Sequence, residues 1–176
     1  MIINTSNRMK RFAAIAGSAL MGLMFATVSY AELEVVTAEV TFADPISITP
    51  VNQLQFGVLD VALNLETIII ATNDGVSGTG TTLIIGGTQL AADMTIAASP
   101  GPTITILVDN PSPGTGYTLG TFRCKYGAGA DTACDPAYTA TAGASTTLKI
   151  GATLTGTNSA SVGNADGTFD LTIVYQ

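Results

Sequence analysis

The chain has 176 residues, of which 47% are hydrophobic and only 11% are charged, against about 25% charged residues in an average globular chain. Its formal net charge is −7 and it contains no His. An acidic chain of this kind is a poor partner for the phosphates of nucleic acid, and without His it lacks the commonest general base and a common zinc ligand.

The N-terminus has the pattern of a secretory signal. A cationic start at residues 8–11 precedes an apolar run over residues 12–28, and small residues stand at the positions that a signal peptidase reads, ending at Ala31. The apolar run is short for a membrane span. We therefore expect residues 1–31 to be removed during export, so that a mature chain without a membrane span begins at Glu32. It would pass through the periplasm to the cell surface.

Residues 32–176 are enough for one hydrophobic core, since a chain of this length buries roughly two thirds of its unfolded surface. They carry three cationic residues against thirteen acidic ones, a net charge of −10. No fixed-period repeat and no long linker divides them. We expect an N-terminal strand within residues 32–44 and a single domain over residues 45–176.

Residues 33–42 alternate loosely between apolar and polar side chains, which indicates a β-strand. The segment holds neither Lys nor Pro, although exposed edge strands are usually protected by such residues. Two arrangements stay open: the strand pairs within its own domain, or it is donated to a neighbouring copy, with Asp44 and Pro45 as the hinge. Its apolar row consists of Val36, Ala38, Val40 and Phe42.

Turn residues divide the middle of the chain into short β-rich segments, and no window shows the 3.6-residue period of a helix. Gly86 and Gly87 are expected to end one strand, and the strands at 94–97 and 103–108 are expected to pair around a Pro/Gly turn. This pattern predicts an all-β sandwich almost without helix. Strands are expected at residues 46–49, 54–58, 66–72, 81–85, 94–97, 103–108, 117–124 and 145–154.

Cys124 and Cys134 are the only cysteines, and an isolated pair in an exported protein indicates a disulfide. The segment between them is rich in Gly and Ala, so we expect a local clamp on a loop, worth roughly 2–3 kcal/mol, on which the core does not depend. A zinc site lacks further ligands. Asp131 and Asp135 flank Cys134 without the spacing of a calcium loop, and we expect neither a metal nor another cofactor.

The last segment alternates up to a penultimate aromatic and predicts a β-strand that closes the chain. It follows Gly163, the fourteenth residue from the end. This combination resembles the C-terminal pattern of chaperone–usher pilus subunits, in which the last strand is the edge where assembly happens. An ordinary closing strand of a β-sandwich explains it as well. The apolar row consists of Phe169, Leu171, Ile173 and Tyr175.

Three motifs stand out in the chain: Leu54-x-Phe56-Gly57, Leu148-x-Ile150-Gly151-x-x-Leu154, and Gly167-x-Phe169 running to Thr172-Ile173-x-Tyr175. Together they resemble the bacterial family known as domain of unknown function 4402, over about residues 38–175. The chain departs from the family pattern at Ala152, where a second glycine is common, and in its cysteine pair. It is also similar to archaic chaperone–usher pilins and to spore-coat-U-like domains.

The resemblance implies a secreted, immunoglobulin-like and pilin-like β-sandwich without catalytic residues. We expect a structural subunit of a fimbria or surface filament, joined to its neighbours by strand addition, with a periplasmic chaperone and an outer-membrane usher as partners. The alternative is a monomeric adhesin that binds glycans, but the chain has no Trp for stacking on sugars. An enzyme is not expected, because the carboxylates are scattered and no Ser has a nucleophile-elbow context.

Overall fold

The computed structural model describes residues 39–40, 42–112, 114–157, 162–163 and 166–176. The chain divides into two compact units, Met1–Val40 and Thr41–Gln176. Of the first unit only Glu39 and Val40 are described, and neither lies in a strand. The predicted signal at residues 1–31 lies outside the described residues, as do Val36 and Ala38. All the strands described below belong to the second unit.

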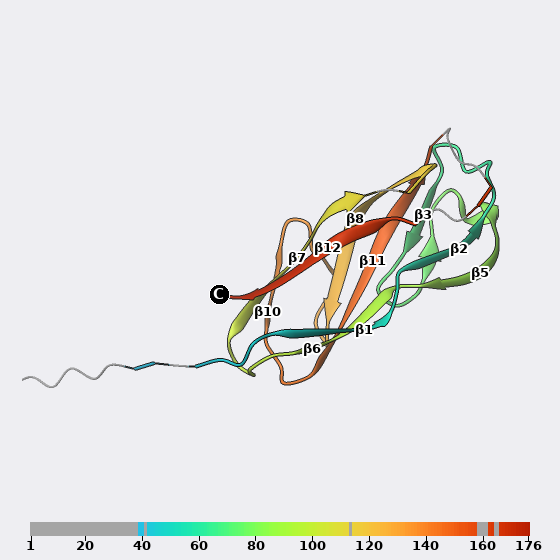
Figure 1. The fold of residues 1–176 in the computed structure, drawn as a ribbon. Helices are drawn as coiled ribbons and strands as arrows, with labels where there is room; N and C mark the ends of the chain where they lie inside the picture. Colours follow the sequence, from blue (N-terminus) through green and yellow to red (C-terminus); the bar gives the residue numbers. More distant parts are fainter. Residues whose placement is uncertain (1–38, 41, 113, 158–161, 164–165) are drawn as a thin grey trace, which may run out of the picture. The chain divides into compact units, whose positions relative to one another are not determined.

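The larger sheet has seven strands, all antiparallel to their neighbours, with β11 in the middle (Figure 1). On one side, β11 pairs first with β6 and then with β3; on the other it pairs with β8 along most of its length. The ends of the main path are β1 and β4, and β9 adds to β8. The strands are β1 (Ser47–Asn52), β3 (Thr67–Ile70), β4 (Val76–Ser77), β6 (Ala92–Ala97), β8 (Tyr117–Tyr126), β9 (Thr132–Ala133) and β11 (Thr146–Gly156).

Two smaller sheets form the opposing layer. The three-stranded sheet has the order β10–β7–β12, and β2 pairs with β5 in a sheet of their own. A short 3-10 turn, η1, leads into β5. Both smaller sheets are antiparallel. The elements are β2 (Gln55–Leu59), η1 (Thr81–Leu83), β5 (Ile84–Leu90), β7 (Thr103–Ser112), β10 (Tyr138–Thr141) and β12 (Thr168–Tyr175).

The core lies between the layers in two clusters. The larger cluster joins the seven-stranded sheet to the three-stranded one, with fully buried side chains such as Ile96 and Leu148 facing Ile104 and Ile106. The smaller cluster joins Ile68 and its neighbours to the β2–β5 pair. Fully burying one such aliphatic side chain contributes about 1.5–3 kcal/mol. The predicted all-β sandwich is therefore confirmed, and no α-helix occurs in the described part of the chain.

The expected strand at residues 81–85 was partly wrong. Residues 81–83 form the 3-10 turn, and β5 begins at Ile84 and continues through Gly86 and Gly87. The register between β2 and β5 shifts on both sides of Val58, and Gly87 has a φ of +78°. The two glycines thus accommodate a bulge inside the strand instead of ending it.

The expected pairing of the strands at 94–97 and 103–108 was also wrong. These segments belong to β6 and β7, which lie in different sheets. The Pro/Gly segment between them carries the chain from one layer to the other, so that Ile96 and Ile104 approach the same core from opposite sides. A turn composition predicts a reversal of the chain, but not whether the next strand pairs with the last or packs across from it.

Candidate functional site

The closing strand β12 forms one end of its sheet. One edge pairs with β7, from Thr168 opposite Ser112 to Tyr175 opposite Ile104, with an irregularity between Thr168 and Asp170. The other edge has no strand partner among the described residues. It carries neither Lys nor Pro. Such an edge presents unpaired N–H and C=O groups to which a further strand can bind.

The apolar row of β12 lies where the sequence predicted it, on one face of the strand. Its four side chains are half-buried and pack against the larger core cluster, and the rings of Phe122 and Phe169 lie 5.1 Å apart. The equivalent row of the central strand β7 is fully buried instead. The row on β12 is thus incompletely covered at the free edge. Gly163, the remaining residue of the predicted pattern, precedes β12 and adopts a φ of +138°. The half-buried row is Phe169, Leu171, Ile173 and Tyr175.

Tyr175 also makes contacts that the sequence did not predict. Its hydroxyl donates to the carbonyl oxygen of Asp44 at 2.9 Å and accepts from the backbone N–H of Ser99 at 2.8 Å. The backbone N–H of Asp44 donates to Oγ of Ser99 at 2.6 Å. We call this group of three residues the Tyr175 latch. It holds the segment before β1 against the end of the last strand. The signal in the sequence was only the Asp44-Pro45 pair, interpreted as a hinge.

Within the segment that was predicted as a donor strand, the members of the apolar row that are described are Val40 and Phe42. These two side chains are 69% and 90% exposed, and neither residue lies in a strand. Phe42, which belongs to the sandwich unit, therefore makes no strand pairing within it. An exposed Phe next to a fixed Asp44 is available to a partner.

Cys124 and Cys134 are bonded to each other, with Cα atoms 5.5 Å apart. The bond closes a short loop, as expected, with the two cysteines ten positions apart. The expectation that the core does not depend on it was wrong, because both residues are fully buried members of the larger core cluster. Cys134 donates its N–H to the carbonyl of Phe122, and its own carbonyl accepts from Val108, both at 3.2 Å. Pairing of β9 with β8 turns the loop inward, so Cys134 contacts both layers of the sandwich.

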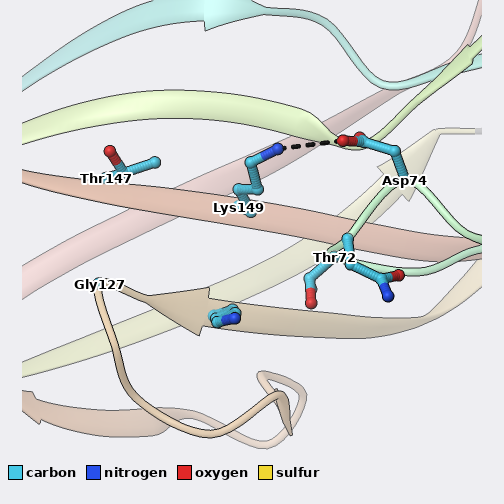
Figure 2. A pocket seen from close by; sticks show the side chains of 7 residues that line it. Thr72, Asp74, Gly127, Thr147 and Lys149 are labelled. Carbon is cyan, nitrogen blue, oxygen red and sulfur yellow. Dashed lines mark hydrogen bonds and ion pairs between the residues drawn. The ribbon is translucent and has the colours of Figure 1, made fainter.

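A polar pocket of about 280 Å³ lies over β8 and β11 on the seven-stranded sheet (Figure 2). Nζ of Lys149 donates to Asp74 at 3.1 Å, and the other oxygen of that carboxylate accepts from the backbone N–H of Ala91 at 2.8 Å. The backbone hydrogen bond, supported by Lys149, holds the pKa of Asp74 below its usual value in spite of partial burial. The pocket is lined by Thr72, Asn73, Asp74, Lys125, Gly127, Thr147 and Lys149.

A second carboxylate lies beside the pocket. Burial tends to raise the pKa of Asp131, but hydrogen bonds from Thr72 and Arg123 outweigh burial and lower it. The hydroxyl of Thr72 donates to this carboxylate at 2.6 Å, and Nη2 of Arg123 donates to the backbone carbonyl of the same residue at 2.7 Å. These pairs tie the turn after β3 to β8. Within the described ranges, no group of three or more acidic or cysteine side chains is placed to hold a metal ion.

A family profile described as "Domain of unknown function (DUF4402)" matches residues 46–175. The chain belongs to this family. Searches of curated proteins and of solved structures gave no match. The DUF4402 match begins one residue before β1 and ends with the last residue of β12, so it covers the whole sandwich and leaves the exposed Phe42 and the anchored Asp44 outside.

At two glycines of the DUF4402 motifs, the structure leaves no room for a side chain. Gly57 has a φ of +83°, and a Cβ there would lie 2.7 Å from the carbonyl oxygen of Gly86. A Cβ on Gly151 would meet the carbonyl oxygen of Ile70, because β11 and β3 approach closely at this point.

No helix in the described residues of this DUF4402 protein is both long and apolar enough to cross a bilayer.

Proposed function

We propose that this chain is a structural subunit of a bacterial fimbria or surface filament, assembled by β-strand addition. The observation that carries this proposal is the free edge of β12 with its half-buried apolar row. A strand added to that edge would pair with its unpaired backbone groups and cover Phe169, Leu171 and Ile173. Each new backbone hydrogen bond contributes about 0.5–1.5 kcal/mol, and the covered apolar area adds about 25 cal/mol per Å².

The occupant that fits this edge is residues 33–42 of a neighbouring copy. The alternation of apolar and polar side chains in this segment has the same period as that of β12, so one face can cover the half-buried row. The exposure of Val40 and Phe42 supports donation, because neither side chain is buried within its own copy. The interface would repeat from copy to copy without closing, which is the geometry of a filament.

The proposal includes export of the subunit and its protection by a chaperone in transit. The bonded pair Cys124–Cys134 fits an oxidising compartment, and residues 1–31 have the pattern of a secretory signal. A subunit with an open edge aggregates unless the edge is covered in transit. We therefore infer a periplasmic chaperone that covers β12, an outer-membrane usher, and a final place in a fimbrium at the cell surface.

The test compares residues 32–176 with the same chain lacking residues 32–42. We expect the longer chain to form filaments in negative-stain micrographs and the shorter chain to aggregate or to lose stability. A peptide of residues 32–44 should rescue the shorter chain and raise its melting temperature. The matched control is the same peptide with Val40→Asp, which places a carboxylate in an apolar contact and should not rescue. A shorter chain that stays monomeric and is as stable as its parent would exclude strand donation.

A monomeric glycan-binding domain is the second candidate, and the polar pocket over β8 and β11 favours it. The hydroxyl of Thr147 and the amide of Asn73 suit the hydroxyl groups of a sugar, whereas the Thr72 hydroxyl is buried and already donates to Asp131. The pocket has no aromatic side chain on which a sugar ring can stack, however, and the ion pair of Lys149 with Asp74 occupies part of its polar surface. Glycan binding by a chain that never assembles would favour this candidate over the filament subunit.

A further inference from the structure

The Tyr175 latch fixes the point at which the N-terminal segment leaves the sandwich, and we propose that it thereby directs this segment to a second copy instead of its own β12. The inference rests on the proposed function, since it concerns which edge the donated strand reaches. Both backbone groups of Asp44 are engaged, its N–H by Ser99 and its carbonyl by Tyr175. The residue is therefore held from two sides.

The position of the latch determines the direction of any self-pairing. Because β12 ends at Tyr175, Asp44 lies at the end toward which β12 runs. Figure 1 shows this end of β12 and the start of β1 at the same end of the sandwich. A segment that leads into Asp44 and lies along β12 of the same chain must run in the same direction as β12. Self-pairing is therefore parallel, whereas a segment from a second copy is free to pair antiparallel, which is slightly more stable per residue.

Self-pairing also requires a reversal of the chain next to the latch. Ser47 pairs with Ala97 and Asn52 with Asp93, so β1 runs away from the latch. The segment before it would have to fold back within residues 43–46. The Asp44-Pro45 pair is itself compatible with the start of a turn, but a turn closed on the carbonyl oxygen of Asp44 competes with the Tyr175 hydroxyl for that oxygen. A hydrogen-bonded reversal here therefore competes with the bonds by which Ser99 and Tyr175 hold Asp44.

The length of the segment does not prevent self-pairing. Residues 33–42 in extended form span about 33 Å, and the eight residues of β12 span about 26 Å. A released segment would therefore reach along its own strand. The bonds of the latch and the parallel direction of self-pairing remain as the features that favour the second copy.

The experiment uses residues 32–176 with Tyr175→Phe, which removes the hydroxyl and keeps the ring against the core. Tyr126→Phe is the matched control, because the Tyr126 hydroxyl also accepts a backbone N–H, from Gly143 at 3.2 Å, but takes no part in the bonds that hold Asp44. Ser99→Ala is a second variant that loosens the latch by a different route. Light scattering after size exclusion gives the fraction of monomer, and hydrogen exchange of residues 36–42 reports whether the segment is paired in that monomer.

We expect Tyr175→Phe and Ser99→Ala to raise the monomer fraction about fivefold over the parent, the change that one ordinary hydrogen bond produces, with residues 36–42 protected in the monomer. Tyr126→Phe should match the parent. If the parent assembles and both latch variants assemble equally well, the inference about the latch is wrong, while the proposed function is not affected. A rise in monomer with residues 36–42 unprotected also overturns it. A parent that never assembles overturns the proposed function and this inference together.

Discussion

The hydroxyl of Tyr175 donates a hydrogen bond to the carbonyl oxygen of Asp44, a residue 131 positions earlier in the chain. This contact joins the first and the last part of the sandwich's chain at one point. The segment before Asp44 and the free edge of β12 are the two parts that the proposed assembly uses, and the latch sets their relative position within a single copy.

Charging the donated segment should separate assembly from folding. Val40→Asp places a carboxylate in the apolar interface, which costs several kcal/mol of association free energy. The free energy of unfolding of the sandwich should change by less than about 0.5 kcal/mol, because Val40 is largely exposed. Val162→Asp, at a side chain that is 94% exposed, is the control. Filament yield by negative stain and urea unfolding of the monomer are the measurements. Normal filaments from Val40→Asp would contradict donation through this row.

Replacing the cysteines should affect the core as well as the loop. With both cysteines changed to Ala, we expect a loss of about 2–3 kcal/mol from the lost cross-link, and more from the cavity. With both changed to Ser, each buried hydroxyl without a partner adds about 1–3 kcal/mol. The Ser pair should therefore be the less stable in urea unfolding. Equal stability of the two pairs would show that positions 124 and 134 do not behave as core.

A thiol count tests the bond itself. The unreduced, denatured protein should show no free thiol, and two after reduction, because Cys124 and Cys134 are the only cysteines and are bonded to each other. Two thiols without reductant would contradict the disulfide.

Gly151 should tolerate no side chain. Gly151→Ala forces a Cβ against the carbonyl oxygen of Ile70 and should cost about 1–3 kcal/mol or more in urea unfolding. Gly120→Ala is the matched control in the neighbouring strand β8, since a Cβ there meets nothing within 4 Å. It should change stability by less than about 0.5 kcal/mol. Equal costs at the two positions would show that the close approach of β11 to β3 is not what requires Gly151.

Stability should fall in acid through Asp74 and Asp131. Both carboxyls have a pKa in the folded state below the unfolded value of about 3.9. Their contribution is therefore fully present above that value and is lost as the pH falls through the lower folded pKa. Thr72→Val removes a hydrogen bond to Asp131 and should raise the pKa of that carboxyl in an NMR titration. Thr147→Val, in the same pocket, should leave the titration unchanged.

Alternation of side chains predicted much of the fold. Residues 147–154 alternate with a period of two, with the apolar side chains at every second position, and they lie in the buried central strand β11. The strands β9 and β10 were missed, because residues 125–141 are rich in Gly and Ala and carry no apolar row. Their place depends on pairing with β8 and β7, which is a tertiary effect.

The candidate site was predicted only in part, because some of its features depend on tertiary pairing. The apolar face of β12 follows from local alternation, but its free edge depends on which strands pair, and local sequence does not fix that. The latch was not predictable either, since Asp44, Ser99 and Tyr175 are brought together only by the fold. The burial of Cys134 likewise follows from the return of β9 onto β8.

The latch has a mechanical consequence for a filament of the proposed kind. Tension would enter each copy through the strand bound along β12 and leave it through the segment before Asp44. Because Tyr175 lies at the end of β12 and bonds to Asp44 both directly and through Ser99, part of this load would pass through the few hydrogen bonds of the latch. The buried core and the disulfide at Cys134 would lie beside the line of force, so a pulled filament would yield first at the latch and only later by unfolding of its subunits.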